Sequence, residues 1–304
     1  MRAHWVQESY LKAWCDPDSP AHHEPYVWVF DKDARVGKKR APKKLFTLPD
    51  FYKDRRGKND NDPMWLETGL SKIESEFIRV RDTVIVAGKA LSEEDQAILT
   101  TYVGLSFVRT PKYLEFAAEP WRHTVRIMDD MRESFARLPP GSRPSPIVPL
   151  GGRDPSQEIS EEAAREAASH PNQTLIAPLV KVQARILAKM RCMLLMTGQE
   201  PGFITSDSPC VHFNRQDFER PSFYQSGMVS PSHEVTFPII PGCLAFYGWS
   251  SKEEHNGTCG YADAPDEVVA EMNWRTRAFC HDKFVVRRDC TRDHWFDHGV
   301  RAEP

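Results

Sequence analysis

The spacing of apolar residues changes along the chain, and this change limits the fold more than any other feature of the sequence. From residue 64 to residue 138, apolar side chains recur mostly at steps of three and four, as in amphipathic helices. After residue 200, short runs of β-branched and aromatic residues indicate strands. Because helices and strands do not alternate regularly, a doubly wound parallel sheet is not expected.

The predicted helices share an apolar stripe or a recognisable start signal, and they cover residues 64–87, 92–108, 112–138, 160–169, 174–197 and 265–281. Ser92 and Asp95 form a capping-box pattern at the start of the second helix, and Pro111 follows its end. Pro120 predicts a kink or break in the third helix.

The predicted strands are short, and they cover residues 26–31, 203–205, 210–213, 235–237, 243–249 and 284–286. The stretch 139–158 is rich in proline and glycine near its start, which predicts a flexible surface loop. Joining the early and late strands in one sheet would make residues 1–304 a single domain. We therefore expect an α+β fold in which a helical layer packs on a small, mostly antiparallel sheet.

Charge and cysteine usage narrow the class of protein. The 304 residues include 40 basic and 43 acidic side chains, and the net charge of −3 excludes a globally basic nucleic-acid coat, though not a local basic patch. No apolar run approaches the ~18 residues of a membrane span, and the first residues lack a secretory signal core. The seven cysteines are scattered without a Cys-x-x-Cys pair, so we expect free thiols, with Cys192, Cys210 and Cys243 buried. These features predict a soluble cytoplasmic protein with no membrane association.

The first group of candidate residues lies in the opening segment. If this segment is helical, His4 and Glu8 lie one turn apart, and Tyr10 lies on another stripe. A histidine and a carboxylate so placed can bind a metal ion, or act as a base with an orienting acid. The alternative is a short docking helix with Tyr10, Leu11 and Trp14 in the core.

Charged residues on the next helices form the second group. Glu67, Glu74 and Arg81 recur every seven residues beside the apolar stripe of helix 64–87. A partly desolvated carboxylate has a raised pKa and suits a metal ligand or a general base, whereas a Glu–Arg ladder at a solvent edge is the alternative. Arg109, at the end of the following helix, either binds a phosphate or carboxylate group, or caps that helix or pairs with a glutamate.

The turn 205–209, Thr-Ser-Asp-Ser-Pro, lies between two predicted strands. Asp207 at a strand end is in a common position for a metal ligand or catalytic carboxylate, and Ser206 beside it is a candidate substrate contact. The alternative is an Asx turn that satisfies its own backbone. No nucleophile elbow, dinucleotide-binding glycine motif, P-loop or His-Glu-x-x-His is present, which disfavours several large enzyme classes.

Together these residues resemble the motifs of a family called domain of unknown function 4238, found in bacteria and fungi. The opening of that family, His-x-Val-Pro-x-x-Tyr-Leu-x-x-Phe, resembles residues 4–14, with Gln7 in place of the proline. Its later motifs resemble Phe51-Tyr52, Glu67 or Glu74, Arg109-Thr110-Pro111, residues 203–209, residues 237–241 and Asn273. The resemblance groups His4, one of the two glutamates, Arg109 and Asp207, and it implies no particular reaction.

Two functions are consistent with these candidates. The first is a metal-dependent hydrolase, such as a phosphodiesterase or nuclease, in which His4, Glu74 and Asp207 are the catalytic residues and hold a divalent metal ion. An anionic substrate would then contact the remaining candidates, which are Arg109, Ser206 and Tyr10. The basic turn 38–44 would offer a nucleic acid somewhere to dock.

The second function is a non-catalytic ligand-binding or interaction module, in which the polar residues form a structural network. Arg109 would then pair with Glu74 or Asp207. Side chains that converge on an open cleft would favour the hydrolase. Mutual pairing without a cavity would favour the module.

Overall fold

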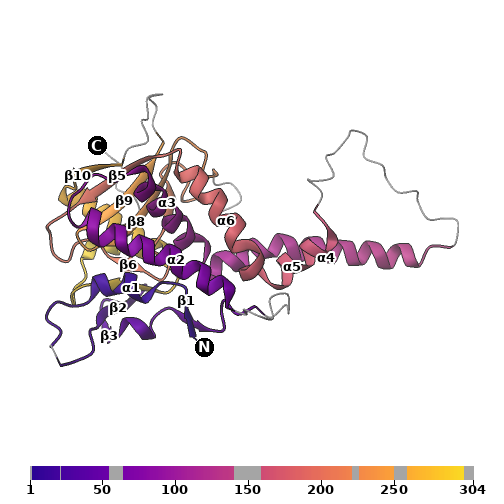
Figure 1. Ribbon diagram of the computed structural model, residues 1–304, viewed down its shortest axis with the longest axis horizontal. Coiled ribbons are helices and arrows are strands. Elements are labelled where there is room, and N and C mark those ends of the chain that lie inside the picture. The colour runs from indigo at the N-terminus through magenta and orange to yellow at the C-terminus, as the bar shows by residue number, and fades with distance from the viewer. Residues whose placement is uncertain are drawn as a thin grey trace.

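Helices and sheets combine in an α+β fold, as the apolar spacing predicts (Figure 1). The computed structural model describes residues 2–20, 22–54, 64–139, 159–220, 226–249 and 259–297. Its α-helices are α1 (Glu8–Leu11), α2 (Trp65–Val80), α3 (Glu93–Val108), α4 (Pro111–Ala136), α5 (Glu161–Ser169), α6 (Pro171–Leu187) and α7 (Asp266–Phe279). Shorter helical turns are η1 (Lys12–Trp14), η2 (Pro42–Lys44), the π-helical η3 (Arg81–Ile85) and η6 (Asp293–Trp295). Apart from its first residue, the predicted loop 139–158 lies outside the described residues.

The strands form three sheets rather than the single small sheet that the sequence suggested. They are β1 (Arg2–His4), β2 (Val27–Asp31), β3 (Lys38–Arg40), β4 (Thr47–Pro49), β5 (Arg191–Met196), β6 (Thr205–Ser206), β7 (Val211–Asn214), β8 (His233–Ile240), β9 (Cys243–Gly248), β10 (Gly260–Asp263) and β11 (Lys283–Val286). The sheets have the orders β10-β5-β9-β8-β7, β3-β2-β11-β6 and β1-β4. The pair β10–β5 is parallel and the other pairs are antiparallel, so the sheets are mostly antiparallel as predicted.

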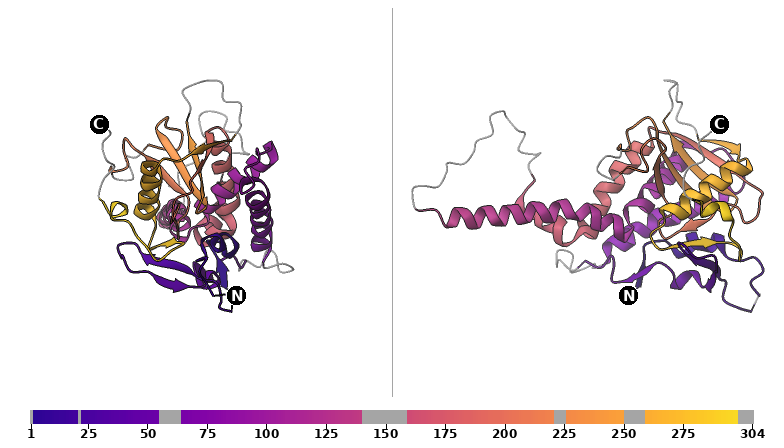
Figure 2. Two further views of the ribbon diagram at one scale, coloured as in Figure 1. Left: turned by 90° about the vertical axis from the view of Figure 1, so that its left-hand side faces the viewer. Right: turned by 180° about the vertical axis from the view of Figure 1, so that it is seen from behind.

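The five-stranded sheet is covered on both faces. Ala245 and Tyr247 of β9 pack in the cluster that includes residues of α2 and α3, whereas Leu244 packs with Met272 of α7. In Figure 2 the yellow α7 lies on the opposite side of the sheet from the purple and pink helices. Because successive side chains of a strand point to opposite faces, a strand covered on both sides has the continuous apolar sequence seen in β9.

The four-stranded sheet joins the two ends of the chain. β2 pairs with β11, and Phe30 lies opposite Phe284 with their rings stacked at 5.1 Å between centroids. The early and late strands therefore do share one sheet, as the sequence analysis anticipated.

One predicted helix is wrong in its second half. The apolar stripe of residues 174–197 predicts a continuous helix, but α6 ends at Leu187 and residues 191–196 form β5. Leu194 is fully buried opposite Ala245 of β9. A short apolar run fits a buried strand as well as a helix, so pairing with β9 decides the conformation.

Helix α4 extends away from the rest of the molecule, with α5 beside it (Figure 1). Pro120 lies inside α4 and does not break it, and Arg122 and Arg126 form ion pairs with Glu115 and Glu119. Within the described residues, no helix has both the length and the apolar content that crossing a membrane requires.

The expectation that every cysteine is a free thiol is wrong for one pair. Cys192 and Cys259 form a disulfide across 67 residues of sequence. Met193 of β5 lies opposite Gly260 of the parallel strand β10, so the residues that precede them are also neighbours. The other five cysteines have no disulfide partner, and Cys210 and Cys243 are buried as expected.

An aromatic segment near the N-terminus lies at the centre of the core. The Tyr10 side chain is 1% exposed, and its hydroxyl donates to the carbonyl of Pro238 at 2.7 Å and lies 2.6 Å from Oγ1 of Thr205. Trp14 donates from Nε1 to the carbonyl of Phe203 at 2.9 Å. Tyr10 is therefore a core residue rather than the predicted substrate contact.

We expect Tyr10→Phe to lower the free energy of unfolding by about 1–3 kcal/mol, because it leaves the buried Pro238 carbonyl without its donor. Chemical denaturation measures this change. The control is Tyr26→Phe, since the Tyr26 hydroxyl makes no hydrogen bond within the described residues, and its effect should stay below about 0.5 kcal/mol. Equal losses in the two variants would contradict the assignment.

Candidate functional site

A polar cavity of about 270 Å³ lies between the N-terminal segment and α2. Its lining includes His4, Glu8, Tyr52, Glu67 and Glu74, and we call it the polar pocket. Residues seven apart share a helix face, so the two glutamates of α2 lie on the same flank. The structure thus brings together the histidine and both candidate glutamates.

The opening segment reaches the polar pocket in a different conformation from the predicted helix. His4 belongs to β1, where it lies opposite Thr47 of β4, and α1 begins only at Glu8. The hydroxyl of Tyr52 donates to the carbonyl of His4 at 3.2 Å. The position of His4 is therefore fixed through its backbone, which leaves its ring to face the pocket.

The His4 ring is held as a neutral base. Burial lowers its pKa, although Glu8, a backbone hydrogen bond with Lys43 and Glu74 oppose this effect. Nε2 is buried and has no hydrogen-bond partner among the described residues, so the bond with Lys43 falls to Nδ1. When Nδ1 donates a proton to a carbonyl, Nε2 carries the free lone pair.

Glu67 is the second unsatisfied group in the pocket. Its Oε2 is buried and has no hydrogen-bond partner within the described part of the chain. Burial raises the pKa of Glu67, and the neighbouring Glu74 carboxylate raises it further. Glu67 therefore holds a proton more strongly than an ordinary glutamate.

Glu74 is satisfied by an ion pair with Arg109. The guanidinium is 1% exposed, is not part of the lining of the pocket, and forms its ion pair through Nη1. Burial alone would lower the pKa of Arg109, but Glu74 and two nearby tyrosines raise it overall, so Arg109 remains a cation. The predicted role of Arg109 as a substrate contact is not what the geometry favours. Pairing with Glu74 is instead one of the arrangements expected for a structural network.

Asp207 lies outside the polar pocket, and both oxygens of its carboxylate accept hydrogen bonds. Its carboxylate accepts hydrogen bonds from the backbone N–H groups of His281, Asp282 and Lys283 at 2.7–2.9 Å. It therefore holds the start of β11 against the turn after β6, and it does not line the polar pocket. The structure does not bring Asp207 together with His4 and Glu74.

Ser206 has a local structural role. It is fully buried in β6, lies opposite Phe284 of β11, and its Oγ accepts a hydrogen bond from the backbone N–H of Ser208 at 3.1 Å. A side chain in this position lies outside the polar pocket and is not the predicted substrate contact.

The predicted metal site does not assemble. Two of its three ligands share the polar pocket, but the third, Asp207, uses its carboxylate to bind backbone. Across the described residues, no three side chains of histidine, cysteine, aspartate or glutamate are grouped so that they could hold a metal ion.

Sequence reasoning singled out His4, Glu8, Glu67 and Glu74 of the pocket, but it missed several other contributions, among them those of Lys43 and Lys12. Lys43 contributes a backbone hydrogen bond to His4, and its side chain pairs with Glu24 instead. Lys12 lines the pocket and forms an ion pair with Glu8 at 2.9 Å. Glu8 and Lys12 are four residues apart, and this spacing predicts an ion pair on a helix. A backbone contact such as that of Lys43 leaves no pattern in the side chains.

The comparisons with known proteins give a family but no reaction. The model of the family described as protein of unknown function (DUF4238) matches residues 2–291, and the chain belongs to this family. No curated protein and no solved structure matches the chain.

We expect Glu74→Ala to lower the free energy of unfolding by about 3–5 kcal/mol, because it leaves the buried Arg109 cation without a partner. The matched control is Glu76→Ala on the same helix, whose exposed ion pair with Arg79 is worth less than about 1 kcal/mol. Urea denaturation of both variants checks the difference. A loss of the same size in both would show that the ion pair with Arg109 is not stabilising.

The raised pKa of Glu67 predicts a pH-dependent change in stability. The folded protein binds this proton more tightly than the unfolded chain, so stability falls as pH rises from about 4.5 through the folded pKa. Compared with wild type, Glu67→Gln should therefore gain stability between pH 4 and pH 7. Thermal unfolding across this range measures the gain. Glu115→Gln should change in the opposite direction, because Arg122 lowers the pKa of Glu115.

Proposed function

We propose that this protein is a hydrolase that carries out acid–base catalysis in the polar pocket. One observation carries the proposal: His4 Nε2 and Glu67 Oε2 are both buried, both lack a hydrogen-bond partner among the described residues, and both belong to side chains lining one cavity. Buried polar groups without partners are costly, and at a cavity they point to a ligand that completes them.

The two groups have complementary roles in hydrolysis. His4 Nε2 takes a proton from a water molecule as the water oxygen bonds to the electrophilic centre of the substrate. Glu67, in its protonated form, donates a proton to the leaving group as the old bond breaks. Exchange of one proton with solvent then restores both residues.

The lining of the pocket favours an uncharged substrate, such as an ester, an amide or a glycoside. Lys12 and Arg109, the cations nearest the pocket, are paired with Glu8 and Glu74, so among the described residues neither is free to hold the charge of a phosphodiester. The basic turn that suggested a nucleic acid is also partly neutralised, because Lys38 and Lys43 pair with acidic residues. A nucleic-acid substrate therefore has less support than a small uncharged one.

The experiment measures the rate of hydrolysis of chromogenic substrates. They are p-nitrophenyl acetate, a p-nitroanilide, a set of p-nitrophenyl glycosides and bis(p-nitrophenyl) phosphate. We expect turnover of an uncharged substrate, with kcat lowered about 100-fold or more in Glu67→Gln and in His4→Gln. Glu76→Gln on α2 and His123→Gln on α4 are the matched controls, since both side chains are exposed and outside the pocket. Unchanged kcat in both pocket variants would overturn the proposal.

The pH profile gives a further check on the two roles. His4 must be neutral and has a pKa below 6.5, whereas Glu67 must be protonated and has a pKa above 4.5. The rate should therefore rise with pH as His4 loses its proton and fall as Glu67 loses its proton. Glu67→Gln should abolish the falling limb.

A non-catalytic ligand-binding module is the second candidate. The observation in its favour is that Arg109 pairs with Glu74 and that Asp207 binds backbone, as a structural network requires. For such a module, a pocket ligand would raise the melting temperature of wild type but not of Glu67→Gln, with no product formed.

A cytoplasmic location stays a proposal with evidence on both sides. The five cysteines without disulfide partners favour a reducing compartment, whereas the Cys192–Cys259 disulfide favours an oxidising one.

A further inference from the structure

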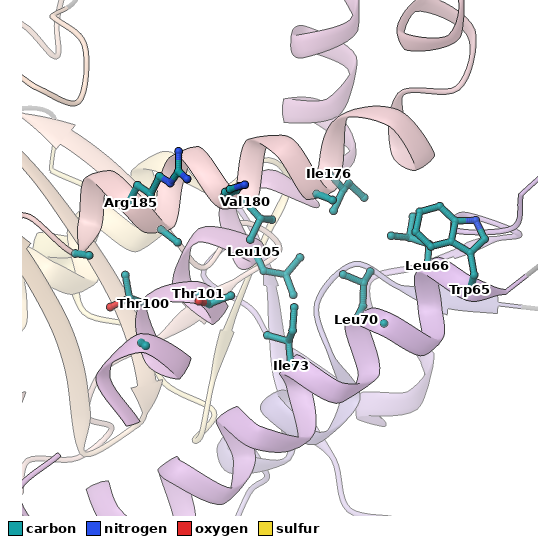
Figure 3. A pocket seen from close by; sticks show the side chains of 16 residues that line it. Trp65, Leu66, Leu70, Ile73, Thr100, Thr101, Leu105, Ile176, Val180 and Arg185 are labelled. Atoms are coloured by element: carbon teal, nitrogen blue, oxygen red, sulfur yellow. The ribbon is translucent and has the colours of Figure 1, made fainter. Parts of the chain in front are cut away.

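A second cavity, of about 600 Å³, lies between α2, α3 and α6. Figure 3 shows Leu70 and Ile73 of α2 across the cavity from Ile176 and Val180 of α6, with Leu105 of α3 between them. We call this cavity the apolar groove. Its volume lies within the range of small-molecule sites in proteins, about 300–1,000 Å³, and apolar lining is typical of them.

Charge in the apolar groove is confined to one helix and one sign. Lys181 and Arg185 of α6 line it, and no acidic side chain of the described residues does. Both are exposed, and neither forms an ion pair within the described residues. Residues four apart lie one turn apart on the same helix face, about 5–6 Å between Cβ atoms, so the two cations can bind one small anionic group.

A glycine keeps the apolar groove open. Gly69 lies within α2, where glycine lowers the folding equilibrium constant about fivefold relative to alanine. A Cβ added at Gly69 would meet nothing within 4 Å, so packing in the protein does not require glycine there. Gly104 of α3 differs, because an added Cβ would lie 3.1 Å from the Cβ of Gln183. Gly104 thus permits close packing of α3 on α6, whereas Gly69 widens the cavity.

We propose that the apolar groove binds a single-chain fatty-acid-type carboxylate, with its alkyl chain along Leu70, Leu105 and Val180 and its carboxylate at Lys181 and Arg185. An apolar body with one anionic end matches an apolar lining with two unpaired cations on one turn of α6. This site is separate from the proposed hydrolase site, since the polar pocket lies on the other flank of α2 and, of the described residues, only Leu70 lines both cavities.

The binding test uses sodium dodecanoate below its micellar concentration, measured by isothermal titration calorimetry. We expect one molecule bound per chain, and affinity that rises by up to about fourfold per methylene from octanoate to dodecanoate. Dodecanol, which lacks the charge, should bind at least about tenfold more weakly. Absence of dodecanoate binding, or equal binding of dodecanol, overturns the proposal.

Two sets of variants test the position of the ligand. Gly69→Leu fills the cavity from α2 and should weaken dodecanoate binding at least tenfold while the melting temperature stays the same or rises. Lys181→Glu combined with Arg185→Glu should weaken dodecanoate but leave dodecanol binding unchanged. Lys189→Glu, exposed near the same end of α6 but outside the groove, is the control for charge.

The outcomes separate this inference from the proposed hydrolase. Dodecanoate binding that survives both Gly69→Leu and the charge reversals places the ligand elsewhere and overturns the inference. Glu67→Gln should leave dodecanoate affinity unchanged, so loss of hydrolysis and loss of fatty-acid binding are distinguishable. If Gly69→Leu is unstable, Gly69→Ala and the dodecanol comparison provide the same test.

Discussion

The structure depends on an aromatic segment that connects parts of the chain far apart in sequence. Trp5, Tyr10 and Trp14 donate side-chain hydrogen bonds to backbone carbonyls around residues 203–207 and at residue 238. The carbonyls of Phe203 and Asp207 lie on either side of β6, and that of Pro238 lies within β8. The Tyr10 ring packs against aromatic side chains of α2, α3 and β8. Because these contacts bring residues 5–14 to the helices and to two sheets, they also determine where His4 meets α2.

Helix α2 separates two cavities of opposite character. One flank carries Glu67 and Glu74 toward the polar pocket, whereas Gly69 and Ile73 line the apolar groove. Leu70 lines both cavities, and the rest of the apolar stripe packs in the core. The buried Arg109–Glu74 ion pair joins α2 to the end of α3, and it therefore fixes the helix that borders both cavities.

The spacing of apolar residues was sufficient to predict the α+β class and most helices. An amphipathic helix buries every third or fourth residue, whereas a buried strand has a short continuous or alternating apolar run, so the two patterns differ. The spacing failed where a helix and a strand would bury the same residues. Leu194 is such a residue, because its conformation depends on pairing with β9, which lies far along the chain. The Cys192–Cys259 disulfide could not be predicted from the sequence for a similar reason, since it depends on the register between β5 and β10. Spacing also could not show that the Asp207 carboxylate turns toward backbone and lies outside the pocket that His4 and Glu74 line.

Hydrogen bonding distinguishes Tyr10 and Asp207 from His4 and Glu67 among the candidate residues. Tyr10 and Asp207 use their polar atoms on backbone of distant segments, so selection for folding alone explains them. His4 and Glu67 keep buried polar atoms that have no hydrogen-bond partner in the described part of the chain, and such atoms lower the stability of the fold. Proteins retain such costs mainly at sites where a ligand makes the missing contacts. In the polar pocket two such groups line one cavity, and folding stability alone does not explain that arrangement.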